Sequence, residues 1–174
     1  MKHILEDFHN CPYCGSIRFE INNEKSKLCA DCGFCYYLNP SAAVAAFILN
    51  EKNELLVGVR AKEPQKGTLD LPGGFVDCNE TAEQAIAREI KEELNLDATD
   101  IRYQFSLPNV YRYSGLDIPT LDLFFTSIVS DFSSLTVADD VMEARFVPID
   151  KLNPAEFGLA SIGKGVEIFK NLKK

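Results

Sequence analysis

Short apolar runs, separated by polar or glycine-containing segments, dominate the pattern of the chain and predict strands. Six runs have the length and composition of strands: residues 42–50, 54–60, 68–72, 101–107, 121–129 and 143–149. Residues 19–28 have the pattern of a hairpin with Asn22-Asn23 at its turn. Residues 108–120 are rich in proline, glycine and tyrosine, so they are expected to form a connection between two strands.

Two longer segments have the 3.6-residue periodicity of helices. Thr81 and Gln84 have the spacing of a capping box, so a helix is expected to start there and run to about Leu94. A second helix is expected over residues 160–171, with three apolar side chains on one face: Ile162, Val166 and Phe169. Strands combined with two helices predict an α/β fold, in which helices cover the faces of a mixed β-sheet.

The first of these helices carries carboxylates where apolar side chains are expected. Its apolar stripe is formed by Ile86, Ile90 and Leu94. Glu93 falls almost in line with that stripe, two turns beyond Ile86, and Glu89 lies beside it. Because like charges repel and burial adds a cost of desolvation, this arrangement requires compensation by a cation.

Three carboxylates converge on one side of this helix, at positions i, i+3 and i+4: Glu89, Glu92 and Glu93. Mg²⁺ is bound by a few carboxylates together with phosphate oxygens of a substrate, which such a face offers. Arg88 can hold a neighbouring carboxylate in a bidentate pair. Gly73-Gly74 ends the preceding strand and permits a close approach of the backbone. The alternative is an ordinary solvated helix face, on which paired glutamates are common.

Composition and charge narrow the classes of function. The chain has 174 residues, 46% of them hydrophobic, which suffices for one core and a small appendage. It has no apolar run of about 18 residues and no apolar region of a signal peptide, so a cytoplasmic location without membrane contact is expected. The net charge of −8 disfavours general binding of nucleic acids. An acidic protein that binds phosphates needs cations, which again favours a metal.

Four cysteines form two copies of a CxxCG knuckle: Cys11, Cys14, Cys29 and Cys32. Each knuckle directs two thiolates at one point, and the glycine allows backbone amides to face the sulfurs, so a closed tetrahedral zinc site is expected. Disulfides or free thiols are the alternative. Cys35 and Cys78 fit neither knuckle and are expected to be ordinary thiols. The predicted domains are a small zinc ribbon at residues 1–40 and a larger domain at residues 41–174.

The larger domain resembles the Nudix hydrolases, whose box is written G-x5-E-x7-R-E-U-x-E-E-x-G-U, with U an aliphatic residue. The matching positions are Gly74, Glu80, Arg88, Glu89, Ile90, Glu92, Glu93 and Leu96. Asn95 replaces the late glycine, and asparagine is the next best residue for a left-handed position at a helix end. The resemblance implies a Nudix-type α/β/α sandwich with a mixed β-sheet, preceded by the zinc ribbon.

The resemblance also implies the roles of the matching residues. The three glutamates would hold Mg²⁺ or Mn²⁺ with help from the Gly73 carbonyl, and Glu80 and Arg88 would organise the loop and the carboxylates. Glu89 or Glu92 would take a proton from the attacking water. A further acidic ligand is expected from a later loop, either Asp140 or Glu143, although a solvated acidic loop is the alternative reading of both.

The reaction implied is hydrolysis of the pyrophosphate bond in a nucleoside diphosphate linked to another group, by metal-assisted attack of water. The ribbon joined to this domain resembles the NADH pyrophosphatases, but their Ser-Gln-Pro-Trp-Pro-Phe-Pro signature is replaced by SLPNVYRY at residues 106–113. NADH, NAD, ADP-ribose, dinucleoside polyphosphates and sugar nucleotides therefore remain candidate substrates. The expected substrate contacts are Arg60, Phe75, Tyr111 and Tyr113, and Lys66 and Arg112 are further candidate phosphate partners. For each of the three cations the alternative is a solvated surface charge. The two tyrosines are equally compatible with ordinary strand positions.

Other classes of function remain open. One is a nucleic-acid-linked role, either removal of nucleotide caps from RNA or regulation by a ligand-sensing protein. Another is isomerisation of an isoprenoid diphosphate, which would require Cys78 near the metal site. The zinc ribbon is expected to be structural, because metal binding supplies folding free energy that a short chain lacks. A homodimer is expected from the family resemblance.

Overall fold

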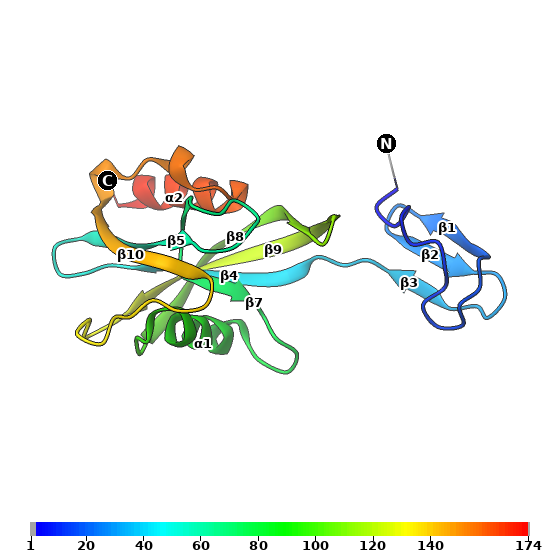
Figure 1. Cartoon of the computed structure of the whole chain (residues 1–174), viewed down its shortest axis with the longest axis horizontal. Coiled ribbons are helices and arrows are strands. Elements are labelled where there is room, and N and C mark those ends of the chain that lie inside the picture. The colour runs from blue at the N-terminus through cyan, green and yellow to red at the C-terminus, as the bar shows by residue number, and fades with distance from the viewer. Residues whose placement is uncertain (1–2, 174) are drawn as a thin grey trace. The chain divides into compact units, whose positions relative to one another are not determined.

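The computed structural model describes residues 3–173, which belong to two compact units, Met1–Pro40 and Ser41–Lys174 (Figure 1). The first unit is built on a three-stranded antiparallel sheet of β1 (Phe19–Asn23), β2 (Ser26–Cys29) and β3 (Cys35–Tyr37), in the order β1-β2-β3. No helix among the described residues is long and apolar enough to cross a membrane.

The hairpin turn of the first unit lies at Glu24-Lys25, two residues beyond the predicted Asn22-Asn23. Asn22 is part of β1, and its side-chain amide donates to the Ser26 hydroxyl across the hairpin at 3.0 Å. The Asn23 side chain accepts from the backbone N–H of Lys25 at 3.1 Å. Asparagine therefore stabilises this turn from its edge, as an Asx motif, and does not occupy its tip.

The second unit contains two sheets within the described residues. The four-stranded mixed sheet has the order β7-β4-β9-β8, with β4 and β9 parallel. Its strands are β4 (Ser41–Ile48), β7 (Gly73–Phe75), β8 (Thr99–Tyr113) and β9 (Leu116–Ile128). The three-stranded sheet has the order β10-β5-β6, formed by β5 (Glu54–Arg60), β6 (Leu69–Asp70) and β10 (Val141–Pro148). Two short 3₁₀ helices, Ile149–Lys151 and Pro154–Glu156, follow β10.

Helices α1 (Ala82–Leu94) and α2 (Ala160–Leu172) cover opposite faces of the mixed sheet (Figure 1). One face of the sheet packs against α1 through the buried side chains Val44, Ala46, Ile48, Phe125, Ile86, Ile90 and Leu94. The other face packs against α2, where the rings of Phe47 and Phe169 stack with centroids 4.0 Å apart. The predicted α/β/α arrangement with a mixed sheet is confirmed, as are the three buried positions predicted on the second helix.

The predicted connection at residues 108–120 is wrong, because most of it belongs to two long paired strands. β8 runs on to Tyr113 and β9 begins at Leu116, so only Ser114-Gly115 form the turn, both with positive φ. Pro108 is compatible with this because β8 is the edge of its sheet, where a missing N–H is tolerated. The extension places residues 109–113 on a rigid strand.

Helix α1 begins and ends as predicted. Thr81 accepts from the backbone N–H of Gln84 at 3.2 Å, and the Gln84 side chain accepts from the backbone N–H of Thr81 at 2.8 Å, which completes the capping box. Asn95 ends the helix in the left-handed conformation, with φ at 53°. Its side chain donates to the Ser134 carbonyl, which ties the helix end to the loop before β10.

The capping box gives a test of how α1 is held. Replacing Thr81 with alanine leaves one helix-end N–H without its partner, so we expect a loss of about 1 kcal/mol in the free energy of unfolding, measured in urea. Thr136→Ala is the control, because Thr136 is an exposed loop residue. Equal stability of the two variants would contradict a contribution from this cap.

Candidate active site and metal centres

A cavity of about 320 Å³ opens in the second unit, between α1, strands of the two sheets and the loop before β10. Its acidic part is lined by Glu89, Glu92 and Glu93 of α1, by Gly73 and Gly74 of β7, and by Asp139 and Asp140 of the loop before β10. Its other part is lined by side chains of β5, β8 and β9. The cavity therefore combines a cluster of carboxylates with a more neutral wall, as a site for a phosphorylated organic ligand requires.

Glu93 is the most buried of the three glutamates. It is 6% exposed, and its Oε2 accepts a hydrogen bond from the backbone N–H of Gly73 at 3.1 Å. Burial raises the pKa of Glu93 from 4.5 to about 9, against the hydrogen bond from Gly73, and repulsion from Glu89 adds to the rise. The anomaly in the apolar stripe of α1 is thus a buried carboxyl group that lacks a compensating positive charge.

Arg88 draws several carboxylates together. Its guanidinium contacts Glu80 through two hydrogen bonds of 2.6 and 3.2 Å, and its Nη1 reaches Glu89 at 2.8 Å and Glu92 at 3.1 Å. Nη2 also donates to the carbonyl of Phe75 at 3.0 Å. These contacts raise the pKa of Arg88, and the contact with Arg88 lowers the pKa of Glu80. One guanidinium therefore joins α1, the loop before it and the end of β7.

Glu89 and Glu92 differ in their surroundings. Burial raises the pKa of Glu89, although the contact with Arg88 works in the opposite direction. The Glu92 side chain is 52% exposed and lies at the rim of the cavity. The three glutamates thus range from a buried carboxyl at Glu93 to a solvated one at Glu92.

The two glycines of β7 are required by contacts inside the protein. A Cβ added to Gly74 would stand 2.4 Å from an oxygen of Glu89, and one added to Gly73 would stand 2.0 Å from the Val44 carbonyl oxygen. Gly73 also has φ at 154°, which L residues rarely adopt. The absence of side chains therefore lets β7 lie directly beneath the glutamates.

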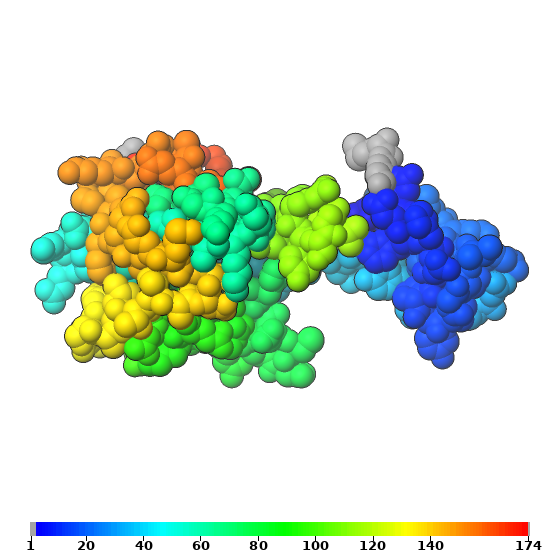
Figure 2. All heavy atoms as spheres, viewed as in Figure 1, coloured from blue at the N-terminus to red at the C-terminus, as the bar shows by residue number. Residues whose placement is uncertain are grey.

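The loop at residues 129–140 brings two aspartates to the cavity. The backbone N–H of Ala138 donates to the Glu93 carbonyl at 2.9 Å, and Figure 2 shows this loop, in yellow, directly against α1, in green. Asp139 and Asp140 line the cavity, and Lys62 forms ion pairs with both, at 2.8 and 2.5 Å. Glu143 is outside the lining and lies 3.1 Å from Arg145. Of the two predicted acidic residues, only Asp140 is therefore at the cavity.

Arg60 and Tyr111 form the opposite wall. Arg60 makes a buried ion pair with Asp70, and its Nη2 lies 3.3 Å from the hydroxyl of Tyr111. Burial lowers the pKa of Arg60, but the adjacent Asp70 outweighs this, so the pKa is raised. The ring of Phe75 meets that of Tyr111 edge to face, with centroids 5.5 Å apart. Three of the four predicted substrate contacts thus lie together at the cavity.

The remaining predicted contacts lie outside the cavity lining. Tyr113 is next to the hairpin turn and 60% exposed, and Arg112 pairs with Asp117 at 2.7 Å. Lys66 is exposed on the loop between β5 and β6. Six polar lining residues were not predicted from the sequence: Asp70, Asp77, Asn109, Thr120, Asp122 and Asp139. A polar residue within an apolar strand, such as Asp122 in LDLFF, was the signal available for finding them.

The donor set fits a hard divalent cation. Mg²⁺ and Mn²⁺ prefer carboxylate oxygens as ligands. Negative charge is concentrated around the buried Glu93, because Glu89 and Asp140 both repel it. The carboxylates are not gathered at one point: within residues 3–173, only the four cysteines have ligand atoms all within 4.8 Å of one another. Glu89 and Glu92 instead contact Arg88. To bind a metal ion, their carboxylates would have to contact the ion as well as the guanidinium.

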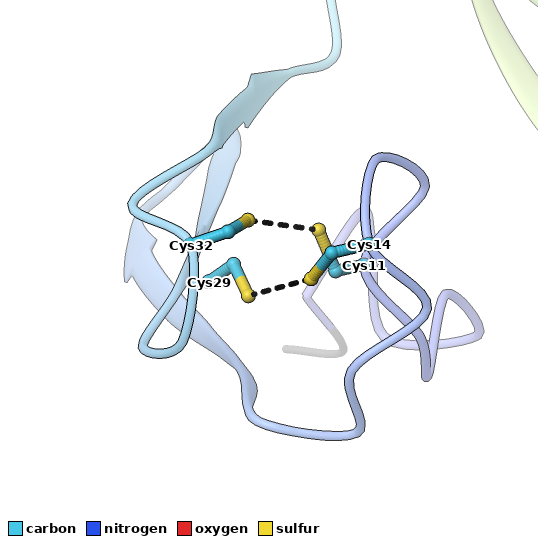
Figure 3. Close-up of side chains that lie close together, drawn as sticks. All are labelled: Cys11, Cys14, Cys29 and Cys32. Carbon is cyan, nitrogen blue, oxygen red and sulfur yellow. Dashed lines mark hydrogen bonds between the residues drawn. The ribbon is translucent and has the colours of Figure 1, made fainter.

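The four cysteines of the first unit form the second candidate metal centre. Their sulfurs point at one another from two knuckles (Figure 3), with 3.8 Å between the Sγ atoms of Cys11 and Cys32 and 3.6 Å between those of Cys14 and Cys29. Zinc–sulfur bonds of about 2.3 Å in a tetrahedron place sulfurs roughly 3.8 Å apart. The spacing of the thiols therefore matches a closed Cys₄ zinc site.

The backbone around the cysteines supports the same interpretation. Gly15 and Gly33 follow the two knuckles with φ of 77° and 75°, the left-handed conformation that glycine favours. Hydrogen bonds from the backbone of Cys32 and, more weakly, of Asp31 lower the pKa of Cys29 to about 6. Backbone hydrogen bonds also lower the pKa of Cys14 and Cys32, but desolvation and contacts with neighbouring thiols outweigh them, so the pKa of both is raised. A thiol with a lowered pKa is available as thiolate, the form that binds zinc.

Comparison with known proteins identifies close matches to the second unit. The NUDIX domain family matches residues 39–164. A protein of Methanocaldococcus jannaschii named ADP-ribose pyrophosphatase is 36% identical over 137 residues, which are 78% of this chain and 78% of that protein. A protein of Vibrio atlanticus named NAD-capped RNA hydrolase NudC is 29% identical over 138 residues, 78% of this chain and 50% of that one. The chain thus spans about half the length of this second relative.

A crystal structure of a NUDIX hydrolase from Nitrosomonas europaea has a similar fold. It matches with a TM-score of 0.71 and 23% sequence identity, covering 93% of this chain and 90% of that chain. At this identity the likeness concerns the fold alone. It includes part of the first unit as well, because the matched share exceeds the length of the second unit.

The buried carboxyl of Glu93 predicts a dependence of stability on pH. Because its folded-state pKa of about 9 lies above the ordinary 4.5, its contribution to stability is fully present below about pH 4.5 and is lost as the pH rises toward 9. Without divalent metal, Glu93→Gln should therefore raise the melting temperature at pH 8 by a few degrees and flatten its decline between pH 5 and 9. Mg²⁺ should stabilise the unmodified protein more than the variant.

The control for this comparison is Glu83→Gln, a change of an exposed glutamate in the first turn of the same helix. It should leave the pH dependence of melting as in the unmodified protein. Parallel curves for all three proteins would show that Glu93 is not desolvated.

Zinc removal provides a test of the first unit. We expect about one zinc ion per chain, and its chelation should make residues 8–35 sensitive to protease while the second unit stays folded. Cys29→Ser should lose the zinc, measured by mass spectrometry of the metal content. Cys35→Ser and Cys78→Ser are matched controls outside the cluster and should retain it. Full zinc content in Cys29→Ser would contradict the site.

Proposed function

The chain belongs to the NUDIX domain family of pyrophosphohydrolases, and on this premise we propose that it hydrolyses the pyrophosphate bond of an adenosine diphosphate linked to a ribose or a second nucleoside. ADP-ribose is the first substrate, followed by NAD and NADH. The name of the Methanocaldococcus jannaschii relative, at 36% identity over 78% of both proteins, supports this order.

One observation carries the proposal: a buried carboxyl, Glu93, lies in a single cavity with Glu89, Glu92 and Asp140, and the wall of the same cavity carries Phe75, Tyr111 and Arg60. A solvated helix face would not bury Glu93 at a pKa of about 9. The carboxylates suit the charged half of a nucleotide substrate through divalent cations. The rings of Phe75 and Tyr111 suit its organic half.

We assign the roles of the residues from their burial. The proposed holders of Mg²⁺ or Mn²⁺ are the two more buried glutamates, Glu93 and Glu89, together with the half-exposed Asp140, whose charge acts on Glu93, and the Gly73 carbonyl beside them. When bound, the cations supply neutralisation of the pyrophosphate charge and make water a stronger nucleophile. Arg88 keeps the glutamates in place, and Glu80 fixes Arg88 from the opposite side.

Glu92 is the proposed proton acceptor. It lies at the solvated rim of the cavity, so it can take the proton from a water molecule that attacks phosphorus in line with the leaving oxygen. Attack on ADP-ribose breaks one phosphorus–oxygen bond of the pyrophosphate and releases AMP and ribose phosphate. Arg60 lines the cavity and could contact a phosphate. Its ion pair with Asp70 also joins β5 to β6, so Arg60 has a structural role as well.

Removal of a nucleotide cap from RNA is the second candidate function. The name of the Vibrio atlanticus relative, at 29% identity, favours it, and the reaction would be the same cleavage on a longer substrate. The acidic balance of the chain, with a net charge of −8, favours free dinucleotides instead, because binding of a phosphate backbone requires clustered cations.

The products of pyrophosphate cleavage test the function: AMP from ADP-ribose, NAD or NADH, and nicotinamide mononucleotide with 5′-monophosphorylated RNA from NAD-capped RNA. With Mg²⁺ or Mn²⁺, we expect hydrolysis of ADP-ribose, NAD, NADH or NAD-capped RNA, and a loss of roughly a hundredfold or more in kcat for Glu92→Gln. Glu93→Gln and Glu89→Gln should in addition require more metal for half-maximal rate. Glu83→Gln, on an exposed part of α1, should retain full activity. Failure of the folded, metal-supplied protein on every substrate would reject the proposed function.

A further inference from the structure

A second buried carboxylate, Asp122, lies in the wall of the cavity and has no part in the proposed chemistry. It belongs to β9, is 5% exposed, and lies on the sheet face that packs against α2. Three donors surround it: the Thr120 hydroxyl at 2.6 Å, the Asn109 side-chain amide at 3.1 Å and the Ser161 hydroxyl. Asp122 is thus held by hydrogen bonds from β8, β9 and α2.

This network determines which way the Asn109 amide points. A carboxylate only accepts hydrogen bonds, so Asn109 must turn its NH₂ group toward Asp122. Its carbonyl oxygen then points away from Asp122, and within residues 3–173 no side chain or loop backbone group donates to it. Because Asn109 is half-buried and lines the cavity, this oxygen is available as a hydrogen-bond acceptor to a ligand.

The acceptor lies next to two aromatic side chains, Tyr111 and Phe75. Side chains two residues apart on a strand share one face, so Asn109 and Tyr111 are neighbours on β8. Tyr111 is fixed by the edge-to-face contact with Phe75 and by the Arg60 guanidinium at its hydroxyl. A fixed acceptor beside two aromatic rings suits a planar heterocycle that carries a hydrogen-bond donor on its edge.

We propose that Asn109, oriented by Asp122, determines the choice of nucleobase by accepting a hydrogen bond from the 6-amino group of adenine. The inference rests on the proposed function and names the base that the site selects. A 6-oxopurine presents an acceptor at the same position, so it meets the Asn109 carbonyl with repulsion and leaves that oxygen unpaired. Ser161 and Thr120 act through Asp122 and are positioning residues.

Binding of AMP and IMP, which differ in the group at position 6 of the purine, tests this choice without turnover. In calorimetric titrations with Mg²⁺ present, AMP should bind about tenfold more tightly than IMP. In Asn109→Leu the ratio should fall to about one, mainly through weaker binding of AMP. Asn109→Ser serves as a second, smaller change, and it should lower the ratio in the same way.

Two further variants distinguish the orientation of the Asn109 amide from a general effect of substitutions in β8 and β9. Asp122→Asn replaces the pure acceptor by an amide that can also donate, so the Asn109 amide can turn over and the ratio of AMP affinity to IMP affinity should fall. Gln104→Leu is the control, because Gln104 lies on the same strand, exposed and outside the cavity lining. It should preserve the tenfold ratio.

The outcomes distinguish this proposal from the proposed function. Equal binding of AMP and IMP by the unmodified protein, or no binding of either, overturns the role of Asn109, even if ADP-ribose is hydrolysed. An unchanged ratio in both Asn109 variants overturns it as well. Preference for AMP that depends on Asn109, in a protein that hydrolyses none of the substrates, would support the base choice and reject the hydrolytic function.

Discussion

The contact of one guanidinium with three carboxylates organises the acidic half of this site. Without Arg88, the side chains of Glu80, Glu89 and Glu92 would repel one another, and α1 would have nothing to join it to the carbonyl of Phe75 at the end of β7. Glu93, beside them on α1, has no ion-pair partner among residues 3–173. The protein thus compensates the outer charges itself and leaves the innermost one to a ligand.

The mixed sheet separates the glutamates of α1 from the polar side chains that β8 and β9 contribute to the cavity wall. Side chains of β4 alternate between the two cores, and the apolar residues on each face hold one helix at a fixed distance. β7, at the edge of the sheet, carries two glycines without side chains. The glutamates of α1 can therefore approach the backbone of this strand closely. The wall beyond them is built from the strands themselves, so its polar side chains are as rigid as the sheet.

Much of this arrangement was predictable because it depends on local sequence. The capping box at Thr81, the left-handed Asn95 and the converging glutamates follow from spacing along one helix, and the cysteine knuckles follow from short repeats. The long β8–β9 hairpin was missed because Pro108 and Pro119 suggest a loop. Pro108 is accommodated on the edge strand β8, and Pro119 precedes the pairing of β9 with β4, which begins at Thr120. Asn109 and Asp122 are thirteen residues apart, and only the strand register brings them together. Local periodicity contains no information about such pairings.

Helix α2 does more than pack against the sheet, because its Ser161 takes part in the polar network of the cavity wall. Its hydroxyl reaches Asp122 from one side of the sheet, whereas the glutamates of the proposed metal site extend from α1 on the other side. A substitution in the C-terminal helix can therefore change the wall without disturbing bond cleavage, and a substitution in α1 can do the reverse. Evolution can explore new substrates on one face of this sheet while it conserves the reaction on the other.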